Sequence, residues 1–197
     1  MKNPAWALLV ILIVTGVLLT VNNLLYLDIL GIGRFITRKK FPEAAAGLGF
    51  KAQSEWSYRV FPDYSGNYKK HDVFISQERS SIRVSIQPVP GLFLNTFKKN
   101  IQFNTGNNTV DLFFSERKAP QATSQKIINS TDLLACIESF IKKWGKKCRK
   151  VDLEPGYIEC ALKFGNGHYV PAWILEPIVS DMVKLADLLQ AAVTEKY

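Results

Sequence analysis

The residues of this 197-residue chain that could carry out acid–base chemistry are few and poorly placed for it. His71 lies in Lys70-His71-Asp72, where a carboxylate beside an imidazole could orient a general base. Adjacent residues on a strand point to opposite faces, however, so His71 and Asp72 do not form a ready dyad. The second histidine, His168, could bind a metal ion, but we expect both histidines at exposed positions.

Motifs of known catalytic and phosphate-binding sites are also missing from the sequence. It contains no Ser or Cys nucleophile motif, no H-E-x-x-H pair, no G-x-x-x-x-G-K-[S/T] loop and no G-x-G-x-x-G turn. We therefore expect a non-catalytic protein that has no catalytic residue, no metal site and no cofactor.

The three cysteines are Cys136, Cys148 and Cys160, an odd number at 12-residue spacings and without a C-x-x-C pair. This spacing favours neither a zinc site nor a disulfide framework. Cys136 and Cys160 lie on apolar faces and are typical of small core residues. Cys148 follows two lysines, which could lower the pKa of its thiol and make it reactive.

A basic segment over 142–150 is the densest charge feature. One interpretation is a docking patch for acidic lipid headgroups or an acidic protein partner. The other is that cations at the end of a helix complement the helix dipole and keep the domain soluble. The aromatic residues are not interleaved with base-stacking spacing, so nucleic acid is not an expected partner. The residues of this predicted docking patch are Lys142, Lys143, Lys146, Lys147, Arg149 and Lys150.

Composition and charge place these residues in a folded chain of one domain with a short accessory segment. Hydrophobic residues make up 47% and charged residues 21%, which excludes an intrinsically disordered chain. The formal net charge is +8, and residues 1–30 contain only Lys2 and Asp28. The positive excess therefore belongs to the rest of the chain, where it would attract an anionic lipid surface.

The segment 5–21 contains no charged residue, and with 22–27 it reaches the roughly 20 residues that a membrane crossing needs. No small-x-small cleavage site follows it, so the sequence predicts an uncleaved transmembrane helix. More cations follow this segment than precede it, which predicts an inner (plasma) membrane protein with its N-terminus out and its C-terminal domain cytoplasmic. Asn22 and Asn23 would lie at headgroup level or contact a neighbouring helix in the membrane. The juxtamembrane charges are Arg34, Arg38, Lys39 and Lys40.

Beyond the apolar segment the pattern predicts strands first and helices later. Apolar spacing of three and four residues predicts one helix that follows a Thr131 cap and ends at Gly145, and another from Pro177 to about Thr194. The resulting fold class is α+β, with an N-terminal transmembrane helix followed by a mostly antiparallel sheet and two packed helices. The expected domains are an anchor (1–30), a basic juxtamembrane connector (31–49) and a soluble domain (50–197). The predicted strands are 50–60, 67–77, 81–88, 109–117, 157–164 and 168–175.

Three short strings carry a resemblance to known proteins: Gly66-Asn67-Tyr68, Thr105-Gly106-Asn107 and Leu185-Ala186. With Asp111 to Phe114, Leu133-Leu134 and Leu188-Leu189, they make the chain resemble bacterial membrane-anchored domains of unknown function. The resemblance implies a location in the bacterial envelope and brings no established activity.

These observations predict a non-catalytic, single-pass membrane accessory subunit or assembly factor. Its cytoplasmic domain would brace a larger integral membrane protein complex. The alternative is a membrane-anchored sensor domain that binds lipid or peptide through the basic docking patch.

Overall fold

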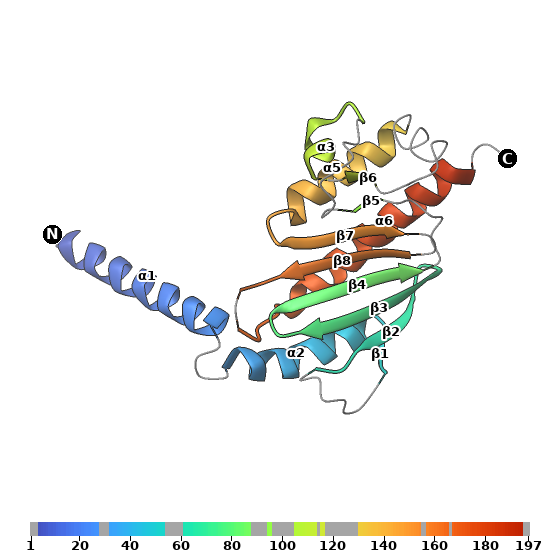
Figure 1. Ribbon diagram of the computed structural model, residues 1–197. Helices are drawn as coiled ribbons and strands as arrows, with labels where there is room; N and C mark the ends of the chain where they lie inside the picture. Colours follow the sequence, from blue (N-terminus) through green and yellow to red (C-terminus); the bar gives the residue numbers. More distant parts are fainter. Residues whose placement is uncertain are drawn as a thin grey trace.

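The computed structural model describes most of the chain and shows one helix that projects from a layered α/β body (Figure 1). The described residues are 4–27, 32–53, 61–87, 94–95, 105–113, 115–116, 130–154, 157–165 and 167–194. The helices are α1 (Pro4–Leu27), α2 (Ile32–Gly47), α3 (Asn108–Phe113), α5 (Thr131–Trp144) and α6 (Leu175–Thr194), with a short 3-10 helix η1 (Ala172–Ile174).

The described strands form one eight-stranded sheet in which every pairing is antiparallel. Its order is β1-β2-β3-β4-β8-β7-β5-β6, so the C-terminal strand β8 lies between β4 and β7. The strands are β1 (Lys51–Ala52), β2 (Tyr64–Tyr68), β3 (His71–Glu78), β4 (Ser81–Gln87), β5 (Leu94–Asn95), β6 (Ser115–Glu116), β7 (Cys148–Glu154) and β8 (Tyr157–Lys163).

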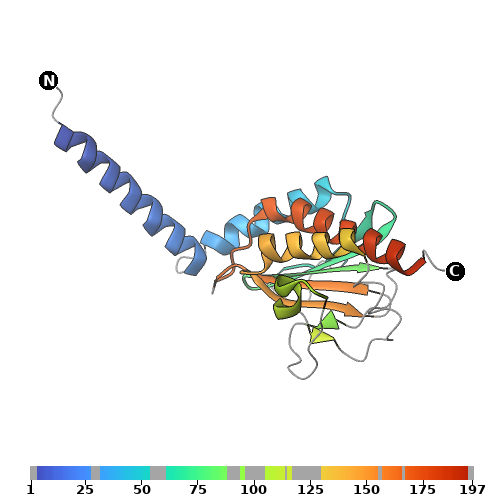
Figure 2. The same cartoon turned by 90° about the horizontal axis from the view of Figure 1, so that it is seen from above.

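The sheet has one face in the core because apolar residues alternate along its central strands. In β4, Ile82, Val84 and Ile86 are fully buried, and in β8 the buried set is Ile158, Cys160 and Leu162. Helices α2, α5 and α6 lie over one face of the sheet (Figure 2). The described core is therefore closed by three helices, one more than the two that the sequence predicted.

The additional helix is α2, part of the segment expected to be a connector. Phe41 and Ala45 of α2 are buried in the core, and its Pro42 stands inside the helix. The backbone N–H of Val170 donates to the Thr37 hydroxyl at 3.0 Å, which ties α2 to the segment before η1. A helix of this kind belongs to the packed body, because its apolar side contributes to the same core as the sheet.

The predicted transmembrane helix is wrong: among the described residues, none of the helices combines the length and apolarity needed to cross a membrane. A crossing needs roughly 20 consecutive apolar residues. The single-pass, inner-membrane localisation, with the N-terminus out and a cytoplasmic C-terminal domain, is corrected by the same finding.

Two predicted strands are replaced by helix. Residues 109–113 of the predicted strand 109–117 belong to helix α3, because the Asn107 side chain accepts hydrogen bonds from the backbone of Thr109 and Val110 at 3.0 and 3.2 Å; in the described part of it, only Ser115–Glu116 forms a strand, β6. In 168–175 the chain enters η1 and then α6, without a strand in the described part from residue 167 on. Pro171 lacks the N–H that a strand would donate there.

The predicted strand 67–77 is two strands joined by a tight turn. Lys69 and Lys70 have φ of 49° and 74°, which lets β2 reverse into β3. Glycine and asparagine are the usual residues in such turns, so two lysines gave no warning of it. Strand β7 was not predicted, and of the predicted strand 50–60 residues 54–60 lie outside the described residues.

Candidate functional site

Helix α1 is the most unusual surface of the described protein. Its apolar side chains from Leu8 to Val14 are exposed without interruption, and Trp6 is 68% exposed. The helix projects from the body and its contacts are made with α2 (Figure 1). Its Thr20 hydroxyl donates to the carbonyl oxygen of Gly16 at 2.8 Å, so this polar group is satisfied within the helix. A helix that is apolar all round is normally covered by other apolar groups.

The described structure does not test the helix–helix contacts that were expected of Asn22 and Asn23. The backbones of Asn22 and Asn23 belong to α1, and their side chains lie outside the described residues.

The four predicted juxtamembrane charges lie on α2, where two of them contact neighbouring side chains. Arg34 Nη2 lies 3.4 Å from Nδ1 of His168, which is half-buried. Lys40 forms an ion pair with Glu43 at 3.1 Å. Arg38 and Lys39 are exposed. The segment is thus a basic helix surface with part of its charge already paired.

In the folded protein some cations of the predicted docking patch form ion pairs with acidic side chains and others do not. Lys142 pairs with Glu138 at 2.5 Å, one helical turn earlier. The ammonium of Lys143 and the indole N–H of Trp144 both donate to Asp181 Oδ2, at 2.6 and 2.8 Å. These contacts hold the end of α5 against α6. The hydrogen bond from Lys142 lowers the pKa of Glu138.

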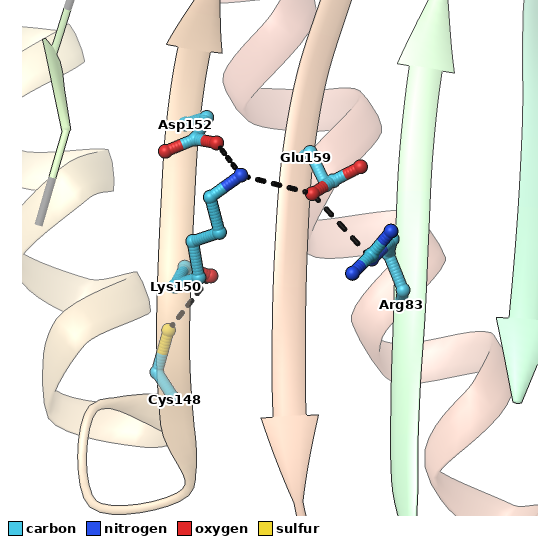
Figure 3. A network of polar contacts seen from close by, with 5 residues as sticks. All are labelled: Arg83, Cys148, Lys150, Asp152 and Glu159. Atoms are coloured by element: carbon cyan, nitrogen blue, oxygen red, sulfur yellow. Dashed lines mark hydrogen bonds and ion pairs between the residues drawn. The ribbon is translucent and has the colours of Figure 1, made fainter. Parts of the chain in front are cut away.

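Lys150 is also paired, because it lies in a charged network across β7, β8 and β4 (Figure 3). Its ammonium contacts Asp152 Oδ2 and lies 3.3 Å from Glu159 Oε1, and that oxygen lies 3.5 Å from Nε of Arg83. Burial opposes a charge on Lys150, but Asp152 and Glu159 outweigh it and raise the pKa of Lys150. The network holds three neighbouring strands together on the face opposite the core.

Three exposed cations of the patch form no ion pair within the described part of the chain: Lys146, Lys147 and Arg149. Lys147 Nζ lies 5.1 Å from the ring centre of Phe164 and 5.9 Å from that of Trp173. Trp173 is 67% exposed. Sequence reasoning missed this tryptophan because it is far away along the chain, in η1.

His71 is not exposed as expected but 2% exposed, with Nε2 at 2.9 Å from Asp187 Oδ1 of α6. Asp72 points to the opposite face, as the alternation predicted. Lys70 also contacts Asp187, at 3.2 Å. Burial opposes the ionisation of Asp187, yet the hydrogen bonds from His71 and Lys70 outweigh it and lower the pKa of its carboxyl. This pair connects the start of β3 to α6.

The thiols of Cys148 and Cys160 lie 3.9 Å apart on neighbouring strands. Cys160 is fully buried, as predicted for a core residue, and Cys148 and Cys136 are half-buried. The hydrogen bond from Cys160 lowers the pKa of Cys148, whereas burial raises the pKa values of Cys160 and Cys136. The lowered pKa of Cys148 agrees in direction with the prediction, although its largest cause is the second thiol.

The hollows of the described surface hold no recognisable catalytic arrangement. One hollow of about 410 Å³ lies between α5 and α6 and is lined by Asp132, Ser139 and Lys184 among others. A second of about 290 Å³ lies on the open face of the sheet beside Phe74, Arg83 and Glu159. The described residues contain no group of three or more His, Cys, Asp or Glu side chains that could hold a metal ion.

The fold and its surfaces define an α+β protein with a projecting apolar helix. No known family model matches the chain, and no curated protein matches it either. Its fold is similar to the crystal structure of the mycobacterial trehalose monomycolate transport factor A, TtfA. The sequence identity is 10%, the TM-score is 0.46, and the match covers 79% of this chain and 93% of that one. A likeness at this level carries no argument about function.

Proposed function

We propose that this protein is a non-catalytic accessory subunit that binds a larger protein complex through α1. The observation that carries the proposal is the continuous exposure of apolar side chains along this helix, with Leu12 67% exposed. Full burial of one such side chain contributes about 1.5–3 kcal/mol. A partner that covers several of them therefore gains enough free energy for a stable complex, even after the cost of association.

A protein partner must offer apolar side chains along a long surface. The 24 residues of α1 extend over about 36 Å at 1.5 Å per residue. Exposed apolar surfaces of this extent mark interaction sites, and an integral membrane protein complex that covers this surface is the partner we propose. The layered body then braces the partner beside the place where α1 binds.

Non-catalytic action is supported by the use of the titratable residues in the described part. His71 binds Asp187, Lys143 binds Asp181, and Lys150 binds Asp152 and Glu159. The His71–Asp187, Lys143–Asp181 and Lys150–Glu159 contacts each join two different elements of the body, which is a structural use of the charge.

Site-specific photo-crosslinking in native cells tests the proposal. A photoreactive phenylalanine at Leu12 is expected to crosslink to one defined protein. The matched control is Leu112 of α3, which is 89% exposed and lies on the body. A partner protein captured from Leu12 and not from Leu112 supports the proposal. Adducts with lipid alone, or equal capture from both positions, would contradict it.

The second candidate function is binding of an anionic surface by the exposed cations of the docking patch that form no ion pair in the described structure. It is favoured by Lys146, Lys147 and Arg149, which are exposed and make no recorded ion pair within the described part, beside the exposed Trp173. The test compares vesicles with and without anionic lipid. Reversal of Lys146 and Lys147 to Glu should remove the preference for anionic vesicles.

The control for that experiment changes the same net charge at Lys142 and Lys143, whose ammonium groups are already paired. If both double variants weaken the preference equally, the effect comes from net charge and the local surface has no special role.

A further inference from the structure

We propose that Cys148 and Cys160 form a reversible disulfide, so that β7 and β8 carry a dithiol site for low-molecular-weight disulfides. The geometric basis is the 3.9 Å separation of their sulfur atoms on two neighbouring strands. This site is independent of α1 and of the partner that α1 binds.

The backbone between these cysteines can adjust to the bond. Cys148 is paired with Leu162, and Cys160 is paired with Val151, so the two cysteines lie diagonally across the β7–β8 ladder. The register shifts between Cys148 and Lys150, which is a β-bulge. A disulfide requires the sulfur atoms to approach to about 2.05 Å. A bulge has an unpaired residue and a locally disrupted ladder, so this movement disturbs few hydrogen bonds.

The two thiols have different exposure, which assigns their roles. Cys148 is half-buried and opens the strand next to the exposed Lys147, whereas Cys160 is completely buried in the core. The hydrogen bond between the two thiols lowers the pKa of Cys148, while burial raises the pKa of Cys160. Cys148 is therefore the attacking thiolate and Cys160 is the resolving thiol.

The reaction proceeds in two exchanges. In the first, the Cys148 thiolate attacks one sulfur of a small disulfide RSSR, forming a mixed disulfide with Cys148 and releasing RS⁻. In the second, Cys160 attacks Sγ of Cys148 while its proton passes to the departing sulfur, which leaves as RSH. The two protein thiols are oxidised by two electrons, and RSSR is reduced to two thiols.

The disulfide would fix the bulge at the beginning of β7. The loop before it carries Lys146 and Lys147, and the bulge itself contains Arg149. Oxidation therefore couples the redox state of the surroundings to the position of the exposed cations.

The experiment treats the purified full chain with oxidised glutathione and identifies disulfides by peptide mass spectrometry. Wild-type protein is expected to give a Cys148–Cys160 link. Cys160→Ala is expected to accumulate the glutathione adduct on Cys148, and Cys148→Ala to give neither product. Cys136 is the internal control, because it is half-buried like Cys148 and burial raises its pKa.

A second measurement uses wild-type protein alone and so does not depend on the folding of a variant. Alkylation by iodoacetamide is expected to be about 10-fold faster at Cys148 than at Cys136. Equal alkylation rates would overturn the assignment of Cys148 as the attacking thiol. A stable glutathione adduct on wild-type Cys148, without the link to Cys160, would overturn the dithiol site itself.

Discussion

Asp187 is the residue at which Lys70 and His71, from the β2–β3 turn region, meet helix α6. His71 Nε2 and Lys70 Nζ lie 2.9 and 3.2 Å from the same carboxylate oxygen. His71 is buried, so its ring nitrogen depends on this oxygen for a hydrogen bond. Sequence alone did not show the pair, because its members are 116 residues apart.

Replacing Asp187 with Ala should destabilise the protein at neutral pH. Loss of the partner of a buried group costs about 1–3 kcal/mol, and we expect the lower half of this range because the carboxylate is 40% exposed. The lowered pKa of Asp187 gives stability that is present above the unfolded-state pKa of about 3.9 and is lost as the pH falls through the folded-state pKa.

Urea unfolding of wild type and Asp187→Ala across this range measures the effect. The difference between the two free energies of unfolding should be largest at neutral pH and should shrink in acid. Asp72→Ala is the control, since Asp72 is an exposed carboxylate one residue from His71. A difference that stays constant with pH would show that the charge of Asp187 has no part in it.

Gly66 is required in β2 by a close approach rather than by its backbone angles. A Cβ atom there would lie 2.6 Å from Cδ1 of Phe50 and 3.1 Å from the carbonyl oxygen of Gly49. Phe50 is 4% exposed and has little room to move. Gly66→Ala should therefore cost about 1–3 kcal/mol, as overpacking of a core does.

Thermal unfolding of Gly66→Ala, compared with Gly47→Ala, tests this expectation. A Cβ on Gly47 would meet no atom within 4 Å, so this variant should be as stable as the wild type or slightly more stable. Equal melting temperatures for the two variants would mean that the Phe50 ring moves aside without cost.

At the scale of elements, the sequence predicted those whose own pattern decides their structure. The alternation in 81–88 gave β4 with its buried Ile82, Val84 and Ile86, and the three- and four-residue spacing gave α5 and α6. Elements that depend on distant partners were either not predicted or predicted wrongly. Strand β7 reads CRKVDLE, where the cations Arg149 and Lys150 obscured the pattern. Lys150 is compatible with the sheet because Asp152 and Glu159 pair with it.

The same limit applies to the candidate site. The basic composition of 142–150 was visible in the sequence, but the pairing of Lys143 with Asp181 joins residues that are 38 apart. Glu138 and Asp152 lie within four residues of Lys142 and Lys150, so these two pairs could have been found from the sequence.

Two of the wrong strand predictions could have been avoided from the sequence alone. Pro171 argued against a strand in 168–175, and Asn107 before Asp111 is a helix-start pattern that indicated α3.

Helix α3 should depend strongly on Asn107. Its side-chain oxygen accepts from Thr109 N and Val110 N, and its amide donates to Glu138 of α5 at 2.9 Å. Asn107→Ala removes the cap and the link to α5, so we expect a loss of about 1–2 kcal/mol. Hydrogen exchange of the Val110 amide should also become faster.

Asn108 is the matched control, because it is an exposed asparagine at the next position and begins the helix. Asn108→Ala should leave both the free energy of unfolding and the exchange rate near their wild-type values. The capping role would be refuted if the two alanine variants behaved alike.

At the scale of the whole molecule, the chain separates into a body that closes its own core and a helix whose apolar surface is unpartnered in the described structure. The buried cluster begins at Phe41 and includes residues of α2, the sheet, α5 and α6, but none of the described residues of α1. Stability and association should therefore be carried by different parts of the chain.

Removal of residues 1–31 tests this separation. Because the described α1 contributes nothing to the buried cluster, the 32–197 chain should keep the free energy of unfolding of the full chain, measured in urea, to within about 0.5 kcal/mol, the usual size of a surface effect. The same chain should no longer co-purify with the partner complex, since the apolar contacts of α1 are lost.

Replacing Leu12 and Ile13 with Glu in the full chain is the matched variant, because it retains the length while placing charges on the apolar surface. Both proteins should be folded by near-ultraviolet circular dichroism and absent from the complex. Co-purification of either one at the wild-type level would show that the body binds the partner, and a truncated chain without fixed tertiary structure would show that α1 belongs to the core.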